Sequence, residues 1–259
     1  MITSNKNSKV KYVVRLQAER RFRWREQAFV VEGTRWLAEL ADFGHPVKLV
    51  FFTEDWVDLP DHADILQQFA VPVQAVSPEV MAAMSDTETP AGVLAVVGMT
   101  PRPLPARPSL LLILDGVQNP GNLGTMLRTA AAAGVDGVLL GPGCVDPYNP
   151  KVLRGSMGAH LRLPVQALAW SEMEPLLAGL TVWLADVAEG LDYTAVSWQT
   201  PSALIIGSEA WGAGAEAVAL ADGRCTIPMH TATESLNAAL AAGIILFEAA
   251  RQRRNPAAP

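Results

Sequence analysis

The sequence contains little cysteine, and its two cysteines form no recognisable pattern. Cys144 and Cys225 stand far apart among 259 residues, with no CxxC pair and no histidine at the spacing of metal ligands. We therefore expect neither a disulfide framework nor a zinc site, and no bound metal ion. Two isolated thiols are most simply explained as packing residues.

Long apolar runs are also absent. The longest, residues 238–247, has ten residues and includes Gly243, whereas a membrane-spanning helix needs about 20. The first residues, MITSNKNSKVKYVVRLQ, lack the apolar core and small-residue cleavage site of a secretory signal. We expect a cytoplasmic protein without a membrane segment.

Negative charge is nearly missing from one stretch of an otherwise acidic chain. The formal net charge of −6 argues against a protein that coats nucleic acid indiscriminately. Residues 6–25 nevertheless carry eight basic side chains against one acid, Glu19. Apolar residues stand among these charges, which indicates an ordered part of a small domain. The basic cluster is either a solvated face or a surface that binds nucleic acid.

The chain predicts two α/β domains joined by a proline-rich segment. Hydrophobic residues make up 50% and charged residues 18%, as in proteins with well-buried strands. Strand-like and helical segments alternate up to residue 98 (helices 34–43 and 61–70, extended chain 47–53, 71–76 and 92–98, and a capped helix start at 77–79). Four prolines between 99 and 109 favour extended chain. We therefore expect domains at 1–98 and 110–259, with a linker at 99–109.

The second domain predicts a parallel sheet. Short apolar runs suited to buried strands alternate with helical segments (strands 110–114, 137–140, 181–186, 203–206 and 225–227; helices from near 122 and over 150–157). A terminal helix over 233–253 would place four apolar side chains on one face: Leu236, Leu240, Ile244 and Phe247. Its alanines and Gly243 would permit close helix packing. This helix belongs either to the core or to a dimer interface.

The first of three segments that can carry chemistry is NPGNLGTMLRTA, residues 119–130, directly after a strand. It contains neither the GxGxxG of a dinucleotide site nor the GxxxxGKS/T of a phosphate loop. Asn122 and Arg128 either converge on one polyanionic substrate, or Asn122 caps the helix and Arg128 is a solvated helix residue.

The other two segments lie near the end of the chain. In LIIGSEAWG, residues 204–212, Gly207 would let a ligand approach the backbone closely. Glu209 either precedes a helix or is a functional carboxylate at a strand's C-terminal edge, where ligands of α/β sheets bind. In IPMHTATESLNAALAAG, residues 227–243, Thr233 or Ser235 is an ordinary helix cap, and His230 is a loop residue rather than a base.

Taken together and in this order, the three segments resemble the motifs of the SpoU/TrmH family of RNA ribose methyltransferases. The family pattern reads N/D-P-G-N-L-G-x-x-x-R-T-A, then G-x-E-x-x-G, then I-P-M followed by S-L-N, and each part is met here. Residues 29–33 and 84–92 resemble recurring segments of the family's substrate-binding domain. One departure is that Thr231 and Ala232 stand where relatives often have glycine.

The resemblance implies a fold and a set of site residues. The expected fold is α/β, with a C-terminal parallel-sheet domain containing a deep trefoil knot and a smaller N-terminal α/β substrate-binding domain. Two subunits would form a homodimer with shared active sites. The backbone at three positions would bind S-adenosylmethionine: Gly207, Ile227 and Leu236. The polar active-site positions would be Asn122, Arg128, Glu209, Ser235 and Asn237. The expected RNA-binding residues are Lys9, Lys11, Arg15, Arg20, Arg21, Arg23 and Arg25.

The implied activity is methyl transfer from S-adenosylmethionine to the 2′-hydroxyl of a specific ribose in RNA, with ribosomal RNA favoured and transfer RNA the alternative. Arg128 would act as the base, which is unusual for a guanidinium, or would hold a phosphate and stabilise the developing alkoxide; we favour the second role. A non-catalytic RNA-binding or ribosome-assembly factor would have lost the asparagine or arginine of the first segment, and both are present. A Rossmann methyltransferase would need a glycine-rich loop after its first strand and an acid ending the next strand, and neither occurs.

Overall fold

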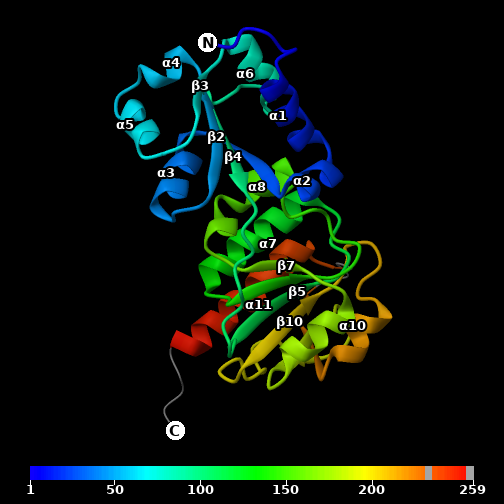
Figure 1. The fold of residues 1–259 in the computed structure, drawn as a ribbon. Helices are drawn as coiled ribbons and strands as arrows, with labels where there is room; N and C mark the ends of the chain where they lie inside the picture. The colour runs from blue at the N-terminus through cyan, green and yellow to red at the C-terminus, as the bar shows by residue number, and fades with distance from the viewer. Residues whose placement is uncertain (231–234, 255–259) are drawn as a thin grey trace. The chain divides into compact units, whose positions relative to one another are not determined.

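The computed structural model describes residues 1–230 and 235–254. These residues form two compact units, drawn in Figure 1. The first comprises residues 1–100 and 148–153, and the second comprises the rest of the described chain. Within the described ranges, no helix combines the length and the apolar character needed to cross a membrane.

The first unit is a small mixed sheet with helices on both faces. Its sheet has the strand order β1-β4-β2-β3, in which β4 runs antiparallel to both neighbours and β3 is parallel to β2. The elements in chain order are α1 (Ser8–Ala18), α2 (Arg20–Glu26), β1 (Ala28–Glu32), α3 (Thr34–Asp42), β2 (Val47–Phe52), α4 (Glu54–Val57), α5 (His62–Gln67), β3 (Val73–Ala75), α6 (Pro78–Met84) and β4 (Val93–Gly98).

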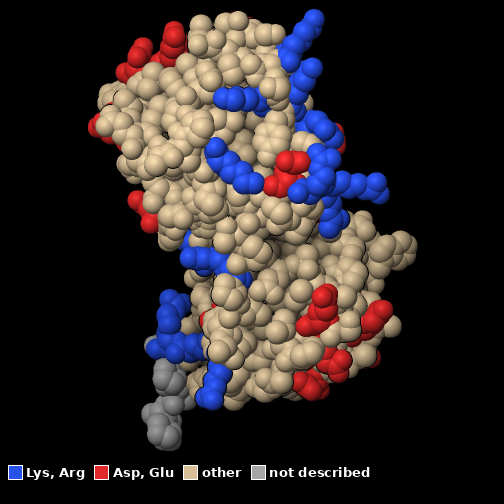
Figure 2. Space-filling view, in the orientation of Figure 1, with Lys and Arg blue, Asp and Glu red and all other residues tan. Residues whose placement is uncertain are grey.

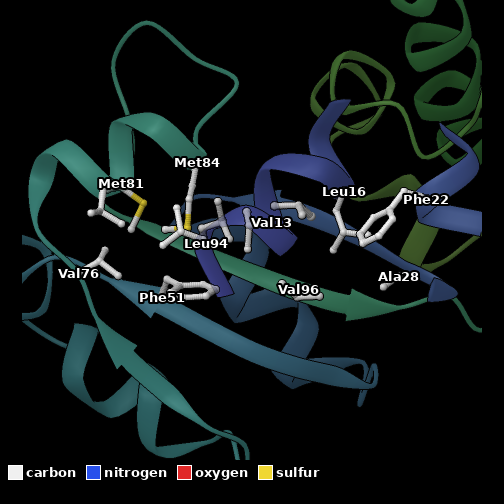
Figure 3. Close-up of a cluster of buried hydrophobic side chains, with 13 residues drawn as sticks. Val13, Leu16, Phe22, Ala28, Phe51, Val76, Met81, Met84, Leu94 and Val96 are labelled. Carbon is white, nitrogen blue, oxygen red and sulfur yellow. The ribbon is translucent and has the colours of Figure 1, made fainter. Parts of the chain in front are cut away.

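The core of this unit forms where α1 and α6 pack on the sheet. Val13 and Leu16, three residues apart on α1, are completely buried, and they meet Met81 of α6 and Phe51 of β2 in one apolar cluster (Figure 3). The Ser77 hydroxyl accepts a hydrogen bond from the N–H of Val80 and caps α6. That helix start is the one predicted from the sequence.

The second unit is a layered α/β structure. Figure 1 shows α7 and α11 side by side over one face of its sheet and α10 on the other. The elements after residue 100 are β5 (Leu110–Leu114), α7 (Pro120–Ala133), β6 (Gly137–Leu140), α8 (Pro150–Ser156), η1 (Ala159–Leu161), β7 (Val165–Ala167), α9 (Trp170–Met173), η2 (Glu174–Leu177), β8 (Thr181–Ala185), β9 (Leu191–Asp192), β10 (Ser202–Ile206), α10 (Ala215–Leu220), β11 (Gly223–Thr226) and α11 (Ala238–Arg254). The first half of α8 belongs to the first unit, which includes residues 148–153.

All seven strands of this sheet are parallel, so the predicted α/β class with a parallel sheet is confirmed, while the knot stays a prediction. The strand order is β7-β6-β5-β10-β8-β11-β9. Two late strands are inserted between earlier ones: β10 lies between β5 and β8, and β11 lies between β8 and β9. Because the strands are parallel, the loops after β5, β8, β10 and β11 all leave from the same edge of the sheet, where α/β proteins bind ligands.

The terminal helix begins later than predicted, and its apolar face is not part of the core. The described part of α11 begins at Ala238, and Thr233 lies outside the described residues. The predicted apolar face does not point into the core: Leu240 is 55% exposed and Phe247 is 46% exposed. The alanine-rich side is buried instead, and Gly243 lies against Thr129 of α7. Small side chains let α11 and α7 approach closely, while Leu240 and Phe247 stay outside.

Candidate active site

A cavity of about 760 Å³ opens at the C-terminal edge of the parallel sheet. Its walls come from the segments that follow β8, β10 and β11 and from the first turns of α11. The inner wall is apolar, because Ile206 and Ile245 are almost completely buried. Six residues predicted from the second and third segments line it: Gly207, Glu209, Ile227, Ser235, Leu236 and Asn237.

Three predicted polar residues form one hydrogen-bonded cluster beside the cavity. The Asn122 side-chain amide donates to Glu209 Oε1 at 2.7 Å, and the Asn237 amide donates to Asn122 Oδ1 at 3.1 Å. These residues belong to α7, the loop after β10 and the start of α11. The cluster therefore joins all three sequence segments at one place.

Asn122 does not cap α7, because another asparagine holds that position. The Asn119 side chain caps α7, accepting from the N–H groups of Gly121 at 2.8 Å and Asn122 at 3.3 Å. The helix accordingly begins at Pro120, two residues before Asn122. At α11 the capping oxygen belongs to Asn237, which accepts from the N–H groups of Ala239 and Leu240, so Ser235 is not the cap and lies exposed on the cavity wall.

Glu209 sits in a tight hairpin rather than at a helix start. Ser208 and Gly212 exchange two backbone hydrogen bonds of 2.9 Å, and α10 begins only at Ala215. A Cβ on Gly207 would come within 2.5 Å of the backbone of Gly212 and Ala213. The close return of the chain therefore requires glycine at position 207, and the predicted donor contact at this position stays a prediction.

Arg128 does not join this cluster within one chain. It lies on α7 six residues after Asn122, a separation of about 240° around the helix axis and about 9 Å along it. Its side chain is exposed, does not line the cavity, and makes no hydrogen bond or ion pair with any residue that the structure describes. Asn122 and Arg128 therefore do not lie side by side in a single chain, because both belong to one regular helix.

The cavity wall also contains an ion pair that the sequence analysis did not predict. Asp186, directly after β8, accepts a hydrogen bond of 2.7 Å from Arg224 of β11. Hydrogen bonds from the backbone N–H groups of Ala188 and Glu189, together with Arg224, hold the pKa of Asp186 below its usual value. The sequence signal for Asp186 is an acid directly after a strand-like apolar run. Glu209 was a candidate for a similar reason, because it follows a predicted strand.

The cysteines are packing residues, as predicted. Both are buried and unpaired, and burial raises the pKa of the Cys225 thiol to about 12. In the described part of the chain, no group of three or more His, Cys, Asp or Glu could hold a metal ion. His230 is exposed in the loop after β11, and the departure at Thr231 and Ala232 lies outside the described residues.

The seven expected RNA-binding residues fall into three groups. Figure 2 shows Lys and Arg side chains gathered over α1 and α2 of the first unit. Arg23 is 3% exposed and donates to the backbone oxygens of Leu16 and Gln17, so it is part of the core. Arg15 and Arg25 are exposed but paired with neighbouring glutamates. Of the seven, the exposed residues that form no ion pair with any described residue are Lys9, Lys11, Arg20 and Arg21.

The two parts of the chain match two known protein families. Residues 109–247 match the SpoU rRNA Methylase family, and residues 7–95 match the MRM3-like substrate binding domain. The first match spans more than half of the chain and includes every residue of the cavity and the polar cluster.

Similar proteins match over nearly their whole length. An uncharacterised tRNA/rRNA methyltransferase of Synechocystis is 39% identical, with 97% of this chain and 94% of the relative covered. The 23S rRNA (guanosine(2553)-2′-O)-methyltransferase RlmP of Bacillus subtilis is 34% identical, with 95% and 97% covered. Among solved structures, the SpoU methyltransferase AviRb of Streptomyces viridochromogenes in complex with AdoMet has a TM-score of 0.90 at 28% identity, with 96% and 99% covered.

Proposed function

This chain belongs to the SpoU rRNA methylase family, and from that premise we propose that it transfers a methyl group from S-adenosylmethionine to the 2′-hydroxyl of a ribose in RNA. The cluster of Asn122, Glu209 and Asn237 beside the cavity carries this proposal. Ribosomal RNA is the favoured substrate, because RlmP is named as a 23S rRNA 2′-O-methyltransferase; transfer RNA is the alternative.

The cavity fits the proposed methyl donor. It combines an apolar inner wall, at Ile206 and Ile245, with carboxylates at Glu209 and Asp186. S-adenosylmethionine combines a flat adenine ring, whose faces can pack on apolar side chains, with a positively charged sulfonium and an ammonium group. AviRb, which has a similar fold, is in complex with AdoMet. We assign the donor to this cavity, with the backbone at Gly207, Ile227 and Leu236 around it.

The polar cluster would position the acceptor ribose. When bound, the donor supplies an activated methyl group, so the protein has to orient the hydroxyl and assist loss of its proton. Asn122 is held from both sides, by Glu209 and by Asn237, and its orientation is therefore fixed before substrate arrives. We assign Asn122, Ser235 and Asn237 to ribose positioning, while the Glu209 carboxylate keeps Asn122 in place.

Arg128 would complete the site from a second copy of the chain. A guanidinium suits the proposed task, since its fork of donors can hold a phosphate and stabilise a developing alkoxide. Its exposed position, away from the cavity of its own chain, fits a role in the partner's site. The outward stripe of α11 at Leu240 and Phe247 offers an apolar surface for the required homodimer.

The first unit would supply RNA affinity. Four exposed basic residues of α1 and α2 without ion pairs to described residues are suited to phosphate contacts (Lys9, Lys11, Arg20 and Arg21). We leave Arg23 out of this set, because its guanidinium is committed to backbone oxygens in the core. The proposal keeps the predicted domain boundaries: a substrate domain at 1–98, a linker at 99–109 and a knotted methyltransferase domain at 110–259.

Methyl transfer can be tested directly. Unmodified 23S rRNA transcribed in vitro is incubated with the protein and isotopically labelled S-adenosylmethionine, digested to nucleosides and analysed by mass spectrometry. The proposal expects label in one 2′-O-methylnucleoside. Label in a methylated base would exclude ribose chemistry, and donor binding without label in ribosomal or transfer RNA would favour a non-catalytic RNA-binding protein.

A further inference from the structure

Four exposed apolar side chains converge on the proposed donor cavity. Val187 is 67% exposed, Trp211 90%, Val218 39% and Met229 38%, and all four line this cavity. They come from the loops after β8, β10 and β11 and from α10. Single exposed apolar residues are common on protein surfaces, but several gathered at one opening mark a place that a ligand covers.

Trp211 is the most exposed of these residues, and its backbone is firmly held. The hairpin that carries it is closed by two hydrogen bonds between Ser208 and Gly212, and the Trp211 N–H also donates to the Ser208 hydroxyl at 3.1 Å. Gly212 has a φ of +68°, which suits glycine. The ring is therefore presented on a preorganised turn, so binding against it orders little additional chain.

We propose that Trp211 is a stacking platform for an unpaired base of the RNA substrate, at or next to the nucleotide that is methylated. This inference rests on the proposed methyltransferase function. Trp211 follows Glu209 by two residues, so their Cα atoms are at most about 7 Å apart. A ribose positioned at the polar cluster thus brings its own base, or an adjacent one, within reach of the ring.

The chemistry of RNA recognition explains why an aromatic platform belongs there. A ribose that enters an enzyme cavity has to leave regular stacking, and its base then lies exposed to water. Proteins hold such bases by stacking them on aromatic side chains. Because every base has a flat face, Trp211 would select for an unpaired nucleotide and would favour purines, which offer more stacking area, without reading hydrogen-bond edges.

Local charge favours a base over other parts of the RNA. Glu209 lies in the same hairpin, whereas the charge of Asp186 in the neighbouring loop is paired with Arg224. Carboxylates repel phosphates, so the uncharged face of a base fits this rim better than the sugar–phosphate backbone. The proposed donor would occupy the enclosed inner part, at the buried Ile206 and Ile245, rather than the exposed ring.

The test compares Trp211→Ala, Trp211→Phe and Trp211→Leu in the full-length protein. Affinity for the unmodified 23S rRNA transcript is measured by filter binding, affinity for S-adenosylmethionine by calorimetry, and assembly by sedimentation. Trp211→Ala should weaken RNA binding about tenfold or more, Trp211→Phe should restore most of the loss, and Trp211→Leu should restore little. Leu191→Ala is the matched control, because Leu191 is 53% exposed but does not line the cavity. Donor affinity and sedimentation should stay unchanged in all variants.

Four results would overturn the inference. Unchanged RNA affinity in Trp211→Ala, or equal rescue by Phe and Leu, would exclude stacking. A selective loss of donor affinity would assign the ring to S-adenosylmethionine, and a change in sedimentation would assign it to the subunit interface. Failure of the proposed function is distinguishable: the wild-type protein would then bind the transcript through Trp211 without methylating any ribose in it.

Discussion

Replacing Asn122 with alanine tests whether the three-residue cluster is catalytic or only structural. The substitution removes the hydrogen bonds to Glu209 and from Asn237. At this partly exposed position we expect a loss of about 1 kcal/mol in the free energy of unfolding. Asn119→Ala is the matched control: it removes the cap of α7 at a similar cost of about 1 kcal/mol and leaves the cluster intact. Each variant should lower the melting temperature by about 2–4 °C.

The two variants should differ sharply in catalysis. Loss of a preorganised group in the transition state typically lowers kcat about 10²-fold or more, so we expect that fall for Asn122→Ala and a change of less than about threefold for Asn119→Ala. Single-turnover methyl transfer at saturating donor measures the chemical step. If both variants lose activity to the same extent, the effect of Asn122 is on stability and its assignment to the site is wrong.

Four further outcomes are expected. Arg128→Ala should lower kcat about 10²-fold with unchanged donor affinity by calorimetry, and Arg128→Lys should rescue only partly, because an ammonium lacks the planar fork of donors; a parallel loss of donor binding would make Arg128 structural. Sedimentation of the wild-type protein should give a mass of about twice 27.7 kDa, and Phe247→Asp should reduce that mass to the monomer's. Mixing the inactive variants Arg128→Ala and Asn122→Ala should restore activity if each site draws on both subunits. Replacing the four exposed basic residues (Lys9, Lys11, Arg20 and Arg21) with alanine should weaken RNA binding and reduce the steepness of log affinity against log salt by about three to four. An unchanged slope would make these residues a solvated face. Burial lowers the pKa of His160 to about 4, so the folded protein keeps this histidine neutral down to that pH, whereas the unfolded chain takes up a proton below about pH 6.5. The free energy of unfolding should therefore fall by roughly 3 kcal/mol between pH 6.5 and 4. Urea titrations of His160→Gln should show a flatter dependence of stability on pH over that window.

Local sequence patterns predicted the strands of the second unit well. Residues 110–114 are a continuous apolar run and form β5 with those limits, because a strand buried on both faces has to be apolar throughout. Helix faces were less predictable. Periodicity placed Leu240 and Phe247 on one apolar face, for the core or for a dimer interface, and within the chain the helix buries its alanines against α7 instead. Which side of a helix meets its neighbour is decided by the tertiary structure, not by the helix alone.

The candidate site could not be assembled from spacing alone. Asn122, Glu209 and Asn237 are distant in the sequence, and each had an ordinary structural explanation until the sheet brought them together. The family resemblance selected them, and the caps at Asn119 and Asn237 explain why the simpler role for Asn122 fails. Arg23 could not be recognised from the sequence as a core residue, because nothing in a run of basic residues indicates which guanidinium is buried.

The central claim is that this chain methylates a specific ribose in RNA, and mapping 2′-O-methylation at nucleotide resolution tests it most directly. Total RNA is compared from cells that carry the gene, lack it, or lack it and express the Asn122→Ala variant. We predict one ribosomal RNA ribose that is methylated with the wild-type protein and unmethylated in the other two strains. Identical methylation maps in all three strains would contradict the claim.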